Sequence, residues 1–87
     1  MPIWVKRSRM RWYATVPSGV EGVTAHLHVT APLAGGTTWL WEARALLGFG
    51  EIQERRCGES DTELEARESA ERAATEVVAE VERRPRS

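Results

Sequence analysis

Two histidines and one cysteine are the residues of this 87-residue chain best suited to metal binding or nucleophilic catalysis. His26 and His28 lie two positions apart, which places both imidazoles on one face of a strand and allows them to share a metal ion. A metal site needs a third and usually a fourth ligand, which Cys57 or a glutamate would have to supply. We therefore interpret the pair as surface histidines on the polar side of a strand and predict no metal site.

Cys57 directly precedes Gly58 on the approach to a predicted helix N-terminus, where a thiolate is favoured. A cysteine nucleophile also needs a histidine base and a pocket that stabilises an oxyanion. The chain has no G-x-S-x-G, P-loop or dinucleotide-binding motif, and its single aspartate, Asp61, is explained by a helix cap. We therefore predict a structural cysteine, no enzymatic activity and no cofactor.

A basic cluster near the N-terminus suggests nucleic-acid binding. The candidate nucleic-acid-binding residues are Lys6, Arg7, Arg9, Arg11 and Tyr13. Cations and aromatic side chains on a sheet can contact phosphates and stack on bases, and Arg44, Arg55 and Arg56 would extend such a surface. Against this function, the net charge is -1 and the isoelectric point about 6.1, whereas DNA-binding modules are usually strongly basic. The arginines are then simply the solvent side of an amphipathic strand.

Four tryptophans, a high number for this length, suggest protein binding instead. Tryptophans supply buried area in a small core, and exposed ones are natural hot spots of interfaces. The candidate protein-binding residues are Trp4, Trp39, Trp41 and Arg44. The leading hypothesis is a non-enzymatic protein-binding module, a regulator or inhibitor that occludes a partner protein. The alternative is a nucleic-acid-binding domain that uses the Arg/Trp face of the sheet.

The acid is concentrated in the last third of the chain, with nine Asp/Glu residues between Glu59 and Glu82. An acidic surface can occupy a basic groove on another protein, because complementary charge speeds association. The other interpretation is a solvated helix stabilised by its own ion pairs. The charges alone leave both open.

Alternation of apolar and polar side chains predicts the strands that must position these residues. Residues 10–16 and 23–30 both have the two-residue period of a half-buried strand and read as an antiparallel pair joined by a glycine-containing loop. Residues 3–6 add a short edge strand ahead of them. Together these segments predict three neighbouring strands, with residues 3–6 at the edge of the sheet.

Residues 37–47 fit either a strand or a helix. As a strand they place Trp39, Trp41 and three small or apolar side chains on one face; as a helix they begin at Thr38 and end at Gly48. We favour the strand, because a glycine-flanked turn and the polar run 51–57 suit a hairpin with an exposed outer strand.

Residues 60–84 predict one long amphipathic helix. Ser60 and Glu63 have the spacing of a capping box, and Pro85 ends the segment. The expected apolar stripe consists of Leu64, Ala66, Ala70, Ala73, Ala74, Val77, Val78 and Val81. The expected ion pairs four residues apart are Glu63–Arg67, Glu68–Arg72 and Glu80–Arg84.

The whole pattern predicts a single α+β domain spanning 1–87. A mainly antiparallel sheet of four or five strands occupies about 3–57, and one long C-terminal helix packs on a face. No run approaches the roughly 18 apolar residues of a membrane span, and the basic N-terminus lacks the apolar run of a secretory signal, so we expect a cytoplasmic protein. Eleven arginines against one lysine suggest a GC-rich bacterium or its phage. Homodimerisation through an exposed sheet edge is a further hypothesis.

Residues 39–44 (WLWEAR), a glycine turn, residues 58–62 (GESDT) and an Ala/Glu-rich helix follow one another in a recurring order. Over residues 39–80 the chain is similar to strand–hairpin–helix units of small bacterial and phage proteins. It loosely resembles HicB-type antitoxin domains, whose last strand runs through Gly and Asp-Thr into such a helix. It also resembles the three-strand-plus-helix DNA-binding domains of phage integrase arms. The resemblance implies a strand–hairpin–helix unit.

Overall fold

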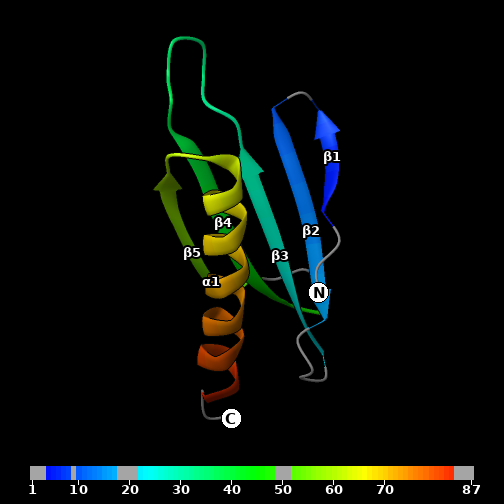
Figure 1. The fold of residues 1–87 in the computed structure, drawn as a ribbon. Coiled ribbons are helices and arrows are strands. Elements are labelled where there is room, and N and C mark those ends of the chain that lie inside the picture. The colour runs from blue at the N-terminus through cyan, green and yellow to red at the C-terminus, as the bar shows by residue number, and fades with distance from the viewer. Residues whose placement is uncertain (1–3, 9, 18–21, 49–51, 84–87) are drawn as a thin grey trace.

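The computed structural model describes residues 4–8, 10–17, 22–48 and 52–83, which form a sheet and a helix in two layers. In chain order the elements are β1 (Val5–Ser8), β2 (Arg11–Pro17), β3 (Val23–Thr30), β4 (Trp39–Leu47), β5 (Ile52–Ser60) and α1 (Glu63–Arg83). Figure 1 shows α1 lying across one face of the sheet. The predicted α+β architecture is confirmed, with five strands in the described part of the chain.

The sheet is an antiparallel meander in the order β1-β2-β3-β4-β5, so each strand pairs with its neighbour in sequence. β1 and β5 are its edges (Figure 1). Residues 39–47 form a strand, as we favoured over the helix. The outer strand of the last hairpin continues past the predicted end at Cys57 to Ser60.

One face of the sheet packs against α1, which lies on β3, β4 and β5. We call it the covered face. Its buried side chains are Ala14, Val23, Ala25, Leu27, Val29, Ala43 and Ala45. The buried side chains of α1 are Ala66, Ala70, Ala73, Ala74, Val77 and Val78. Small side chains on both surfaces let the helix lie close to the sheet, which gives dense packing from little volume.

The opposite face, which we call the open face, carries the other side chain of each alternating pair. It includes Val5, Arg7, Arg11, Tyr13, Thr15, Thr24, His26, His28, Thr30, Leu40, Glu42, Arg44, Leu46, Ile52, Arg55, Cys57 and Glu59. No element of the described structure lies over it (Figure 1). The sheet is therefore buried on one side only.

The N-terminus of α1 is capped by Thr62. The Glu65 backbone N–H donates to Thr62 Oγ1 at 3.1 Å, and the Ala66 N–H donates to the Thr62 carbonyl at 3.0 Å. The predicted cap at Ser60 is wrong, because β5 extends through Ser60 and pairs it with Trp39. Thr62 and Glu65 repeat the spacing of Ser60 and Glu63, so the sequence offered two caps two residues apart.

The predicted apolar stripe of α1 is right except at Leu64, whose exposed fraction is 65%. At 3.6 residues per turn Leu64 lies about 120° around the axis from the centre of the buried stripe. The Glu63–Arg67 pair is present at 3.3 Å. Glu80 pairs with Arg83 at 2.5 Å, whereas its predicted partner Arg84 lies outside the described residues, as does Pro85.

Replacing each candidate cap separately distinguishes them. Thr62→Ala should lower the free energy of unfolding by about 1 kcal/mol, because a backbone N–H loses its acceptor. Ser60→Ala should cost less than about 0.5 kcal/mol, as is usual for a site without such a role. Urea unfolding followed by circular dichroism measures both. A larger loss for Ser60→Ala than for Thr62→Ala would contradict the assignment.

Candidate binding surface

The register of the sheet places chemically active side chains from four strands in one row across the open face. The row consists of Tyr13, His28, Glu42 and Cys57, since each residue is paired with the next across adjacent strands. The adjacent row consists of Thr15, His26, Arg44 and Arg55. Residues directly opposite in antiparallel strands have their side chains in contact range on the same face. The open face therefore has a polar and aromatic centre.

Tyr13 of β2 contacts side chains from both neighbouring strands, β1 and β3. Its hydroxyl forms a hydrogen bond with Nδ1 of His26. Its ring lies edge-on to both imidazoles, with centroids 5.7 Å from His26 and 4.9 Å from His28. The Arg7 guanidinium lies 5.4 Å from the Tyr13 centroid, within cation–π range. The phenol is thus held by neighbours from both adjacent strands.

Glu42 lies between two arginines at the centre of the face. Arg44 Nε contacts Glu42 Oε1, and Arg55 Nε is 3.7 Å from Glu42 Oε2. The Glu42 side chain is 20% exposed, whereas that of Arg55 is 58% exposed. Two cations beside one carboxylate give this group a net positive charge, which can attract an anionic group of a ligand.

His28 is half-buried beside this group, and burial lowers its pKa because the charged imidazolium loses solvent. The positive charge of Arg44 lowers the pKa further, with smaller contributions from His26 and Arg11, while Glu42 opposes them. His28 is therefore neutral at pH 7 and offers one ring nitrogen as donor and the other as acceptor.

A shallow groove of about 550 Å³ extends from Arg11 of β2 over β3, β4 and β5. It is lined by Arg11, His28, Thr30, Leu40, Trp41, Glu42, Arg44, Cys57, Gly58 and Glu59. The lining combines cations, two carboxylates and a leucine that is 47% exposed. Such a mixture suits a ligand with both charged and apolar groups.

The structure separates the predicted protein-binding residues. Trp4, Trp39 and Trp41 are half-buried and belong to the covered side, whereas Arg44 lies on the open face. Trp4 donates its Nε1–H to Glu71 Oε1 of α1 at 3.3 Å. The Trp41 ring lies against Gly58 so closely that a Cβ there would approach its Cζ2 within 2.5 Å. Trp4 and Trp41 thus pack against the buried core between the sheet and α1.

The predicted nucleic-acid-binding residues are also divided. Arg7, Arg11 and Tyr13 lie on the open face. Lys6 lies on the covered side, with its Nζ 5.6 Å from the Trp12 ring centroid, and Arg9 is outside the described residues. Of the arginines that were to extend the surface, Arg44 and Arg55 do so. Arg56 instead points to α1 and pairs with Glu76 at 2.6 Å.

His26, His28 and Cys57 all lie on the open face, but they do not form a common site. Glu42 stands between His28 and Cys57 in their row. Within the described residues, no group of three or more His, Cys, Asp or Glu side chains is arranged to hold a metal ion.

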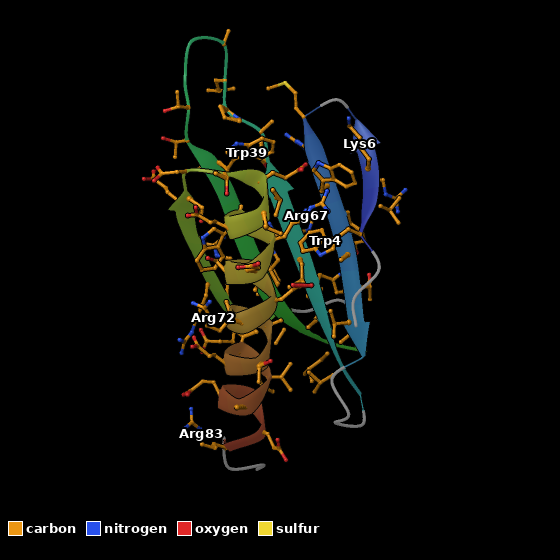
Figure 2. All side chains as sticks on the ribbon, in the orientation of Figure 1. Trp4, Lys6, Trp39, Arg67, Arg72 and Arg83 are labelled. Atoms are coloured by element: carbon orange, nitrogen blue, oxygen red, sulfur yellow. The ribbon has the colours of Figure 1, made fainter. Side chains whose placement is uncertain are left out.

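Arg67 is the residue of structural importance that the sequence pattern missed. Its guanidinium lies 3.9 Å from the Trp12 centroid and 5.8 Å from that of Trp4. Figure 2 shows Arg67 on the side of α1 that is turned toward Trp4. It thereby connects α1 to Trp12 of β2 and to Trp4, which directly precedes β1. The sequence showed only its spacing from Glu63, since a contact across 55 or more residues leaves no local signal.

Comparison of the chain with protein-family models, with curated proteins and with solved structures finds no match. The resemblance to HicB-type and integrase-arm domains therefore stays a prediction. None of the described helical residues forms a stretch with the length and hydropathy needed to cross a bilayer. What the structure defines is a small α+β fold with one uncovered sheet face.

The lowered pKa of His28 predicts a pH dependence of stability. Between that pKa and about 6.5, the ordinary value, the unfolded chain binds a proton that the folded chain does not. The contribution of His28 to the free energy of unfolding should therefore be complete above about pH 6.5 and should decrease as the pH falls through this window. Urea unfolding on both sides of the window should show a smaller pH effect for His28→Gln than for the wild type. Identical pH profiles for the two proteins, or a His28 pKa at or above the ordinary value by NMR titration, would rule this out.

Proposed function

We propose that this chain is a non-enzymatic protein-binding module that occludes a surface of a partner protein with its open face. In this proposal it is a regulator or inhibitor of bacterial or phage origin that acts in the cytoplasm. The observation that carries the proposal is the absence of any covering layer over the open face within the described structure, together with the groove on it. A sheet face without a covering layer keeps its side chains accessible to another molecule.

The chemistry of the groove favours protein as the partner. Arg11 and Arg44 alternate with Glu42 and Glu59, so the surface offers both signs of charge at short spacing. A polyanion would meet two carboxylates there, whereas a protein surface can match both signs. The exposed Leu40 adds the apolar contact that interface centres require.

The mechanism is binding by a preformed surface. The side chains that would contact the partner stand on strands, and Tyr13 and Glu42 are already fixed by their neighbours. Little side-chain freedom is lost on binding, which reduces the cost of association. Leu40 and Tyr13 take the anchoring role that the sequence suggested for the tryptophans, and Arg44 keeps its predicted role.

The experiment compares two leucine variants in capture from the native host followed by binding measurements on the identified partner. Leu40→Asp places a charge in the groove and should weaken binding by about tenfold or more. Leu64→Asp makes the same change at an exposed leucine of α1 and should leave affinity unchanged. Both variants must unfold like the wild type in urea. Equal affinity of Leu40→Asp and wild type would refute the open face as the binding surface.

One observation favours nucleic acid as a second candidate. Arg7 and Arg11 stand beside Tyr13 on the open face, and Arg11 has no carboxylate partner among residues 4–8, 10–17, 22–48 and 52–83. Two cations beside an aromatic ring can hold phosphates while a base stacks.

Fluorescence anisotropy with labelled single strands and duplexes tests this candidate. Binding should weaken steeply with salt, because each neutralised phosphate releases counterions. Arg11→Glu should abolish it, whereas Arg72→Glu on the exposed side of α1 should retain it. The absence of any binding at low salt would eliminate this second function.

A further inference from the structure

The two edges of the sheet differ in how well they are protected against pairing with another strand. β1 has four residues and a register shift between Lys6 and Ser8, and short or irregular edges discourage pairing. β5 has nine residues, and its pairing with β4 is regular from Glu54 to Ser60. Among the described strands it has a neighbour on one side only, so its outer edge offers a row of backbone donors and acceptors (Figure 1).

The order of charges along β5 is complementary to itself. Two copies of β5 that pair about a two-fold axis normal to the sheet must place residues of the same face opposite one another. When Cys57 stands at the axis, each Arg55 lies opposite the Glu59 of the other copy. In the same register Arg56 faces Gly58, so no like charges meet. Moving the axis to Arg56 instead brings two arginines together and removes both opposite-charge pairs.

The side chains needed for these pairs are available within each copy. Arg55 is 58% exposed, and the one ion pair that it forms among the described residues is the 3.7 Å contact to Glu42, which also contacts Arg44. Glu59 is exposed and has no cationic partner in the part of the chain that the structure describes. Arg56 is held by Glu76 on the covered side and does not compete for Glu59.

We propose that the outer edge of β5 is a homodimer interface, occupied by β5 of a second copy in antiparallel orientation with Cys57 at the two-fold axis. The dimer forms one continuous sheet, with both helices on one side and both open faces on the other. Backbone hydrogen bonds along the edge supply the attraction, and the two Arg55–Glu59 pairs select the register. This inference goes beyond the proposed function, because it concerns the outer edge of β5, although Cys57 and Glu59 also line the groove.

Charge exchange tests the register directly. Sedimentation velocity over a concentration series should show a dimer for the wild type. Arg55→Glu or Glu59→Arg should each weaken self-association by about tenfold or more, since each puts like charges opposite one another. The double variant Arg55→Glu/Glu59→Arg should restore the dimer, and a mixture of the two single variants should form a heterodimer. Arg7→Glu makes the same charge change at the other edge and should leave the dimer unchanged.

A thiol-reactive bismaleimide with a short spacer gives a second measurement. It should link two wild-type copies through Cys57, which is exposed, and should link Arg55→Glu copies far less at the same concentration. A wild type that stays monomeric at the highest soluble concentration would overturn the proposal. So would a dimer that Arg55→Glu leaves intact, or a double variant that remains monomeric.

Discussion

The close contact between two alanine-rich surfaces determines the arrangement of this molecule. Alanines from β2, β3 and β4 meet alanines and valines of α1, and the largest fully buried side chains are Leu27, Val29 and Val77. A short chain has little volume to bury, so small side chains at high density replace a large core. The helix therefore lies near the sheet and covers β3, β4 and β5 but not the full width.

The position of the aromatic residues follows from that contact. Trp4 and Trp41 pack against the buried core as partly buried side chains, and Trp12 lies beside Arg67 of α1. There Arg67 extends from the helix to the rings of Trp4 and Trp12, and both its charge and its planar guanidinium suit this contact. All four tryptophans are therefore absent from the open face, which carries arginine, histidine, tyrosine and a few exposed aliphatic residues instead.

The sequence predicts the features that depend on local periodicity, such as the two faces of a strand. It does not predict the features that depend on how strands are aligned with one another. The alternation around Leu27 and His28 correctly separated the two faces of β3, and the small residues of α1 correctly marked its buried stripe. The cap was misplaced because Ser60 and Thr62 both fit the local pattern, and only the pairing of Ser60 decides. The approach of Tyr13 to His28 requires the alignment of two strands, which no spacing within either strand contains.

The order of elements along the chain has a consequence for synthesis. Each strand pairs with the one made just before it, so the sheet can grow by short loop closures, which favours rapid folding. The helix that covers the apolar face follows the five described strands in the chain. The apolar face of the sheet therefore leaves the ribosome before the helix that covers it. Alanine exposes less apolar area than leucine or isoleucine would. The small side chains that allow tight packing therefore also reduce the tendency of the incompletely synthesised chain to aggregate.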